Sequence, residues 1–222
     1  MFSVQAWNET IDKMAEAARK SGRVSEDVKL IAVSKTKPVE EVQAALSAGQ
    51  LIFGENRVQE ALQKFPQLRP ENSNLELHLI GPLQTNKVKE VVRDFDVIQT
   101  IDRAKLVDAV SKEMAKQDRQ LSCFIQVNTG SEPQKAGVEL NELTQLSDYC
   151  AERNLTVEGL MCIPPVEDHP GPHFTLLHKW AERLNLKSLS MGMSSDFEIA
   201  VELGATHVRV GSALFGGRPP LT

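Results

Sequence analysis

Eight short apolar segments recur along the chain, and stretches with the spacing of amphipathic helices lie between them. The segments are six or seven residues long and rich in Val, Ile and Leu, which is typical of strands buried on both faces. They begin at Leu30, Leu51, Leu75, Asp96, Cys123, Val157, Ser188 and His207. Strict alternation of strands and helices predicts parallel strands joined by right-handed crossovers.

Eight such units predict an α/β fold of the (β/α)8 barrel type. The alternative is an open, doubly wound sheet, which would fit the sequence if the true number of strands differed from eight by one or two. A barrel of this kind takes about 250 residues. We therefore expect residues 1–222 to form a single barrel domain, since the chain has 222 residues and no change of composition that would mark a linker. An extra helix is expected before the first strand, with one face formed by Val4, Trp7, Ile11, Met14 and Ala18.

Helix boundaries can be predicted at three places. Pro38 and Gly49 bracket one helix, following the preference for proline at the start of a helix and glycine after its end. Asp102 is the expected N-cap of another helix. Ser195, with Glu198 three residues later, predicts a capping box after the seventh strand.

Composition and charge exclude several classes of protein. The chain has 25 Lys and Arg against 30 Asp and Glu, and its net charge of −5 argues against nucleic acid as the main partner. No apolar stretch approaches the about 20 residues of a membrane-spanning helix, and the first residues lack the apolar core of a signal peptide. We therefore expect a cytoplasmic protein with no membrane partner.

Neither a disulfide framework nor a metal site is expected. The cysteines are odd in number and lack the spacing of metal ligands: Cys123, Cys150 and Cys162. Three of the five histidines cluster in and after a proline-rich loop, but without the spacing of a metal motif: His169, His173 and His178.

The first strand ends in a lysine. In a barrel of this kind the reacting groups lie at the carboxyl ends of the strands. By alternation Lys35 shares a face with Ile31 and Val33. If that face is the interior, desolvation favours the neutral amine, which is the form that attacks a carbonyl group. The alternative is a lysine that reaches solvent along its aliphatic stem.

The last two strands end in residues suited to a phosphate group. The seventh strand leads through Ser194 and Ser195 into a helix, and the eighth ends in Gly211 and Ser212. The turns after strands seven and eight commonly hold phosphate in barrels, because backbone N–H groups at a helix start attract anions. The alternative is that the serines only cap helices and the glycines only turn the chain.

A lysine after strand one and a phosphate site after strands seven and eight become neighbours when a barrel closes. Together they predict a phosphorylated carbonyl compound held as a Schiff base. Two chemistries fit: pyridoxal phosphate as a resident cofactor, or a sugar phosphate as an aldolase substrate. Arg209 favours pyridoxal phosphate, because it lies deeper than the phosphate turn, where it could bind a ring nitrogen.

Seven motifs in order along the chain resemble the pyridoxal phosphate homeostasis protein family. They are Val33–Pro38, Phe53–Glu60, His78–Gly81 with Leu83–Lys87, Lys135–Gly137, Gly159–Met161, Met191–Ser194 and Arg209–Ser212. The resemblance implies a single-domain barrel similar to the N-terminal domain of alanine racemase. It also implies a protein that binds pyridoxal 5′-phosphate (PLP), has no established catalytic activity and serves in vitamin B6 and amino-acid homeostasis.

The resemblance also assigns roles to residues. Lys35 would hold PLP as an internal aldimine, and Arg209 would face the pyridine nitrogen. Asn56 would line the cofactor site. The phosphate would be held by Ser194, Gly211 and Ser212.

The sequence bears on whether the protein is an enzyme. An arginine beside the ring nitrogen disfavours its protonation, which makes the ring a weak electron sink. A racemase also needs two bases, and the only tyrosine, Tyr149, is expected between a helix and the barrel. His78 and Cys162 are the other candidate bases. We expect no catalytic residue, with a PLP-dependent racemase as the alternative.

The partners expected for such a chain follow from a carrier role. The recipients of PLP could be PLP-dependent apoenzymes, and a third hypothesis is an interaction protein that docks a regulator and senses the cofactor. Because no helix presents a strongly apolar outer surface, we expect a monomer. The roles of Lys37 and Lys135 remain open, with Lys37 expected in solvent and Lys135 either at the surface or near the cofactor opening.

Overall fold

The strands form a closed barrel in the computed structural model, which describes residues 1–132 and 134–217. They follow one another around the barrel in chain order, and every neighbouring pair is parallel. The strands are β1 (Lys29–Val33), β2 (Ile52–Glu55), β3 (Glu76–Leu79), β4 (Val97–Ile101), β5 (Ser122–Val127), β6 (Val157–Cys162), β7 (Ser188–Met193) and β8 (His207–Val210). The predicted (β/α)8 barrel is confirmed, and the open sheet is excluded.

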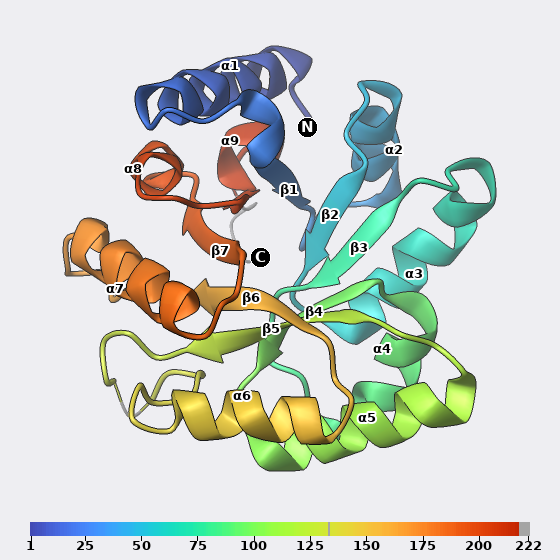
Figure 1. The fold of residues 1–222 in the computed structure, drawn as a ribbon. Helices are drawn as coiled ribbons and strands as arrows, with labels where there is room; N and C mark the ends of the chain where they lie inside the picture. The colour runs from blue at the N-terminus through green and yellow to red at the C-terminus, as the bar shows by residue number, and fades with distance from the viewer. Residues whose placement is uncertain (133, 218–222) are drawn as a thin grey trace.

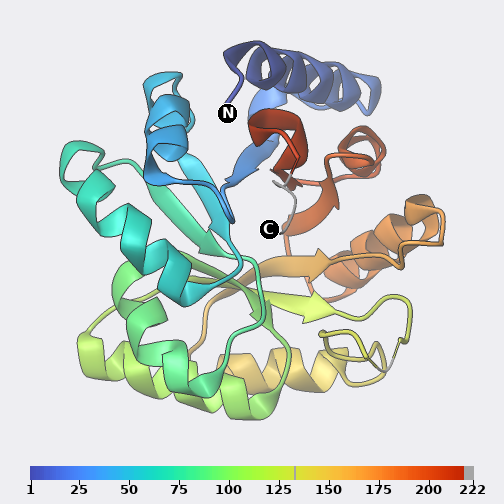
Figure 2. The ribbon, with the colours of Figure 1, turned by 180° about the vertical axis from the view of Figure 1, so that it is seen from behind.

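Helices surround the barrel on its outer side (Figure 1). The α-helices are α1 (Val4–Lys20), α2 (Val39–Ser47), α3 (Val58–Leu68), α4 (Val88–Asp94), α5 (Ala104–Gln117), α6 (Leu143–Glu152), α7 (Pro170–Arg183), α8 (Phe197–Glu202) and α9 (Ser212–Phe215). Short 3-10 turns are η1 (Ser25–Asp27), η2 (Arg69–Glu71) and η3 (Thr85–Lys87). Seen from behind, the same helices form a ring around the strands (Figure 2).

The first and last strands close the barrel. Lys29 pairs with His207, and Ile31 pairs with Arg209. This seam brings the segment after β1 next to the segment after β8, although the two segments are far apart in the sequence. The two segments that carry Lys35 and Gly211 therefore meet at one end of the barrel.

The extra N-terminal helix is present, and its predicted face is buried in part: Met14 and Ala18 are buried, and Trp7 packs against the core. Its buried residues are Thr10, Met14, Ala17 and Ala18, at the spacing i, i+4, i+7, i+8. Two residues expected on the buried face, Val4 and Ile11, are 52% and 36% exposed. The helix packs mainly on α8 and α9.

Two of the predicted caps are wrong. The N-cap of α8 is Asp196, not Ser195, and its Oδ1 accepts a hydrogen bond from the Met193 N–H at 2.5 Å. At α5 the cap position is occupied by Arg103, which pairs with Asp102 instead of leaving it free to cap. The boundaries of α2 are confirmed, because Pro38 is its N-cap and Gly49 follows its end with φ +100°.

The interior of the barrel is partly polar. A small apolar cluster of Val97, Phe124 and Met161 is separate from the main core, which lies between strands and helices. Phe124 meets the buried ring of His207 edge-on, with the ring centroids 5.2 Å apart. The polar side chains inside the barrel lead toward the carboxyl ends of the strands, where the candidate site lies.

Candidate functional site

A cavity of about 410 Å³ lies at the carboxyl ends of the strands. Its volume is within the range of sites that bind small molecules. Each of the six residues singled out in the sequence lines it: Lys35, Asn56, Ser194, Arg209, Gly211 and Ser212. The structure therefore brings together the strand-end lysine, the two glycine- and serine-containing turns and the arginine.

Lys35 lies two residues beyond the end of β1, in the turn before α2. Its side chain is half-buried and contributes to the cavity wall beside Val33. The reading in which Lys35 only reaches bulk solvent does not agree with this position. The next residue, Thr36, has a left-handed backbone with φ 62°, which is uncommon for a residue with a branched side chain.

The turns after β7 and β8 touch each other. Ser194 follows the end of β7, and its Oγ accepts a hydrogen bond from the Gly211 N–H at 3.3 Å. Ser212 begins α9, so its N–H and the next belong to the first turn of a helix, where no intrahelical acceptor exists. Two hydroxyl groups and first-turn N–H groups therefore face one end of the cavity, which is a donor set suited to a phosphate group.

Arg209 forms the floor of the cavity and is 4% exposed. Its Nη1 donates to Ser190 Oγ at 2.6 Å, and its Nη2 donates to the Cys162 carbonyl oxygen at 2.8 Å. Burial lowers the pKa of the Arg209 guanidinium from its ordinary value, although arginine keeps its proton in proteins. A fixed positive charge therefore lies below the cavity.

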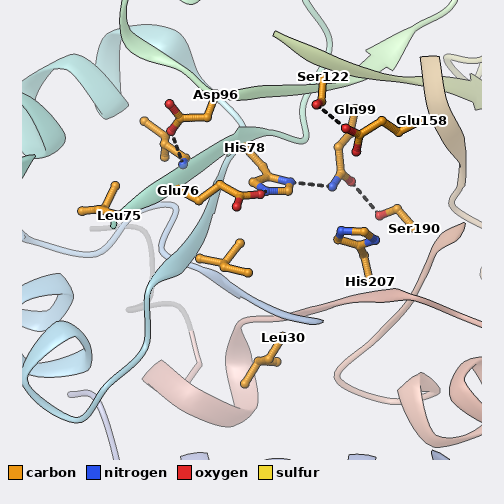
Figure 3. A network of polar contacts seen from close by, with 12 residues as sticks. Leu30, Leu75, Glu76, His78, Asp96, Gln99, Ser122, Glu158, Ser190 and His207 are labelled. Carbon is orange, nitrogen blue, oxygen red and sulfur yellow. Dashed lines mark hydrogen bonds and ion pairs between the residues drawn. The ribbon is translucent and has the colours of Figure 1, made fainter. Parts of the chain in front are cut away.

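A series of hydrogen bonds crosses the barrel interior from Arg209 to Glu76. Figure 3 shows the part of this series that links Ser190, Gln99 and His78. Ser190 Oγ donates to Gln99 Oε1 at 2.6 Å, which links β7 to β4 across the barrel. Gln99 Nε2 lies 2.8 Å from His78 Nδ1, and His78 Nε2 lies 2.5 Å from Glu76 Oε1.

In each of these hydrogen bonds the donor is the residue nearer to Arg209 and the acceptor is the residue nearer to Glu76. Because the amide group of Gln99 donates to Nδ1 of His78, the proton of the neutral ring is on Nε2, which donates to Glu76. This hydrogen bond holds the pKa of the Glu76 carboxyl below its ordinary value. This series of hydrogen bonds therefore begins at the Arg209 cation on the cavity floor and ends at the half-buried Glu76 carboxylate at the other end of the barrel.

Asn56 follows the last residue of β2, Glu55. Gly81 lies so close to its backbone that a Cβ at that position would come within 2.3 Å of the Asn56 carbonyl oxygen. The absence of a side chain at Gly81 therefore lets the loop after β3 pack against the loop after β2. This packing holds Asn56 at the rim of the cavity.

Glu55 is fully buried behind that rim. Its Oε1 accepts hydrogen bonds from the Ser34 hydroxyl at 2.7 Å and from Lys64 Nζ at 2.6 Å. Burial raises the pKa of the Glu55 carboxyl, and Lys64 and Ser34 oppose that rise because they favour its charged form. The sequence analysis had not singled out Lys64. The available signal was its position between Ala61 and Phe65, on the apolar face of α3.

Lys37 also differs from the expectation. It was expected in solvent, but it lines the cavity, and its Nζ donates to the carbonyl oxygens of Phe215 at 2.6 Å and Gly217 at 3.3 Å. Lys37 therefore ties the turn after β1 to the end of α9.

Lys135 is half-buried outside the cavity lining, where it pairs with Glu132 at 2.5 Å and donates to the Pro164 carbonyl oxygen.

The candidate bases lie away from the cavity. The Tyr149 hydroxyl donates to Asp108 Oδ1 at 2.8 Å, which bridges α6 and α5 on the outside of the barrel. His78 and Cys162 are fully buried, and burial raises the pKa of the Cys162 thiol to about 12. None of these three side chains lines the cavity.

The described residues contain neither a group of metal ligands nor a membrane-spanning helix. Between residues 1 and 217, position 133 excepted, no three His, Cys, Asp or Glu side chains are grouped so that they could hold a metal ion. Over the same part of the chain, no helix combines the length and the apolar character needed to span a bilayer.

Comparison with known proteins places the chain in a family. The family model "Alanine racemase, N-terminal domain" matches residues 4–219. A Vibrio cholerae protein named pyridoxal phosphate homeostasis protein is 43% identical over 231 aligned positions, which cover 98% of both chains. The PLP-bound structure of PipY from Synechococcus elongatus is 36% identical, with a TM-score of 0.78, and covers 91% of this chain and 100% of that one.

A second solved structure agrees over more of the fold. A protein of unknown function from Bifidobacterium adolescentis is 27% identical with a TM-score of 0.90, covering 96% of this chain and 94% of that one. The barrel, the order of its strands and the near-complete coverage by relatives all point to one assignment. The chain belongs to the pyridoxal phosphate homeostasis protein family, which has the fold of the alanine racemase N-terminal domain.

Proposed function

We propose that this protein binds pyridoxal 5′-phosphate in the cavity and holds its aldehyde as a Schiff base on Lys35. In this proposal the phosphate lies between the turns after β7 and β8, held by Ser194, Gly211 and Ser212. Arg209 faces the pyridine nitrogen, and Asn56 lines the cofactor site. PLP itself supplies the aldehyde that condenses with an amine and a ring that withdraws electrons.

The chemistry of the donor set supports this assignment. The cavity offers a primary amine on one wall and hydroxyl and N–H donors on another, with a buried guanidinium on its floor. These three kinds of group match the aldehyde, the phosphate and the ring nitrogen of PLP. The observation that carries the proposal is that Lys35 and the Ser194–Gly211 contact line the same cavity, although they come from opposite ends of the chain.

A carrier role is favoured over catalysis by the surroundings of the cavity. Among the described residues that line it there is no Tyr, His or Cys, and Lys37, the second lysine in the lining, donates to the carbonyl oxygens of Phe215 and Gly217. The guanidinium on the floor can donate a hydrogen bond to the ring nitrogen but does not protonate it, because arginine keeps its proton. We therefore propose that the protein stores or delivers PLP in the cell, with PLP-dependent apoenzymes or a regulatory protein as recipients.

The Schiff base is tested by absorption spectroscopy. Addition of PLP to the purified protein should produce the visible band of an imine, and borohydride should remove the band and leave the cofactor bound to the peptide that contains Lys35. The K35A variant should give no band, whereas K37A should keep it, although Lys37 lines the same cavity. A wild-type band that survives in K35A would overturn the assignment.

The carrier role is separated from racemisation by two further measurements. Loaded protein mixed with a PLP-dependent apoenzyme should restore that enzyme's activity, and Cα deuterium wash-in on a panel of amino acids should not exceed the rate given by free PLP. Wash-in above that rate that is lost in K35A would favour a racemase instead. We also propose that residues 1–222 act as one domain and as a monomer, which light scattering of the loaded protein would test.

A further inference from the structure

A buried charged cluster holds the backbone beside Lys35 without lining the cavity. At its centre is Lys64 on α3, which is 5% exposed. Lys64 Nζ donates to the Ser34 carbonyl oxygen at 2.8 Å, to Glu55 Oε1 at 2.6 Å and to Glu60 Oε1 at 3.0 Å. A buried ammonium group has three protons to place, and here each finds an acceptor.

The same two carboxylates also hold the turn directly. Glu55 Oε1 accepts from the Ser34 hydroxyl at 2.7 Å, and Glu60 Oε1 accepts from the backbone N–H of Thr36. Both neighbours of Lys35 in the chain are therefore bound to one cluster. Hydrogen bonds in which a partner is charged are stronger and more directional than neutral ones, so they can define a turn.

The backbone of this turn needs such support. Thr36 has φ 62°, a conformation that costs free energy for a residue with a Cβ and persists only where the surroundings impose it. In a loop without such restraints, the backbone at Thr36 would leave this conformation, and the Lys35 side chain would move with it. The contacts of Ser34 and Thr36 with the cluster supply the restraint.

We propose that Lys64, with Glu55 and Glu60, is a positioning group that fixes the turn after β1 so that the Lys35 amine points at the carbonyl carbon of its ligand. This inference rests on the proposed function, in which that carbonyl is the PLP aldehyde. Glu55 immediately precedes Asn56, so the cluster also fixes a second residue of the cavity rim. The charged groups of the cluster act through the backbone and do not touch the ligand.

Two variants separate positioning from loss of the fold. K64M alone would leave the Glu55 carboxylate buried without its cation, so K64M is combined with E55Q, which removes both charges. E60A removes the acceptor of the Thr36 N–H from a half-buried site. The matched control is R69M, because Arg69 likewise pairs with a carboxylate, Asp96 at 2.6 Å, and ties down backbone carbonyl groups, but at the opposite end of the barrel.

The first measurement needs no cofactor. In the free protein, amide hydrogen exchange of Thr36 should be about tenfold or more faster in E60A and in the E55Q/K64M variant than in wild type, and unchanged in R69M. The second measurement is the rate at which the imine band forms with PLP. This rate should fall by about tenfold or more in the same two variants. The melting temperatures of these variants should stay near that of R69M.

The outcomes are distinct. Unchanged Thr36 exchange in both variants would overturn the positioning role. Faster exchange with a wild-type rate of band formation would also overturn it, because the turn would then be irrelevant to the amine. If wild type itself gave no band that depends on Lys35, the proposed function would fail, and the exchange measurement would still decide whether the cluster holds the turn.

Discussion

Ser194 and Gly211 are joined by a hydrogen bond of 3.3 Å, in which the Gly211 N–H donates to the Ser194 hydroxyl. One residue follows β7 and the other follows β8, so this contact joins the ends of two neighbouring strands. It presents a hydroxyl and the start of α9 to the same part of the cavity. The contact therefore sets the spacing between the two turns.

Removal of this hydroxyl should weaken retention of PLP. In the proposed site, S194A removes a donor to the phosphate and also the link between the two turns, which should raise the dissociation constant by about tenfold or more. Equilibrium dialysis against PLP measures the change. The matched control is S195A, which removes a neighbouring hydroxyl of the same cavity wall and should have a smaller effect. Equal dissociation constants for wild type and S194A would contradict this role.

The chain of hydrogen bonds inside the barrel should contribute to stability. S190A removes the acceptor of Arg209 and the donor to Gln99, and a buried group without its partner costs about 1–3 kcal/mol in the free energy of unfolding. Urea denaturation measures this loss. In the control S122A, which breaks an exposed contact with Glu158, the change should stay within about 0.5 kcal/mol. Equal free energies of unfolding for S190A and S122A would show that the hydrogen bonds of Ser190 do not contribute to stability.

The stability of the protein should fall as the pH falls below about 6.5, through His207. Burial, with smaller contributions from His78 and Lys29, lowers the pKa of His207 to about 3, against 6.5 for the ordinary side chain. Between these values the unfolded chain binds more protons at His207 than the folded chain does. The free energy of unfolding therefore falls with falling pH in this window, by at most about 1.4 kcal/mol per pH unit.

Urea denaturation of wild type and H207Q over about pH 7 to 5 tests this assignment. The difference in stability between the two proteins should change with pH in favour of H207Q as the solution becomes more acidic. A difference that stays constant over this range would mean that His207 does not titrate as its burial requires.

Gly192 should not tolerate a side chain. Its φ is +90°, and a Cβ there would lie 2.5 Å from the Cβ of Ala200. G22A is the matched control, since Gly22 has φ +74° but open space around it and should cost only the backbone strain of about 1–2 kcal/mol. G192A should cost about 1–3 kcal/mol more, because α8 must also move. Thermal melts of both variants decide this, and similar melting temperatures would contradict it.

Much of the fold was predictable because its signals are local. Each predicted strand overlaps an observed one, since the runs of Val, Ile and Leu between helical patterns reflect burial on both faces. Lys35, Ser194, Gly211 and Ser212 followed from the rule that the carboxyl ends of the strands face one side of a barrel. Asn56 was indicated by the family resemblance alone. The buried face of α1 was predicted only in part, because Met14 and Ala18 are buried against α8 and α9 while Val4 and Ile11 are exposed.

The contacts that were missed depend on residues far apart in sequence. Lys37 binds the carbonyl oxygens of Phe215 and Gly217, which lie 178 and 180 positions away. No local pattern contains that information. The cap of α8 was misplaced by one residue because both Ser195 and Asp196 are residue types that favour the cap position. Asp196 occupies it without a side-chain cap hydrogen bond, and its carboxylate accepts from the Met193 N–H instead.

The seam between β1 and β8 has a consequence for the order in which the protein is made. Lys35 is synthesised long before Arg209, so a ribosome-bound chain that lacks β8 has only part of the cavity wall. A ligand that touches both walls can bind only after closure, and by mass action it then favours the closed barrel over every unfinished form. Supply of the ligand would thus set how much of the newly made chain stays folded.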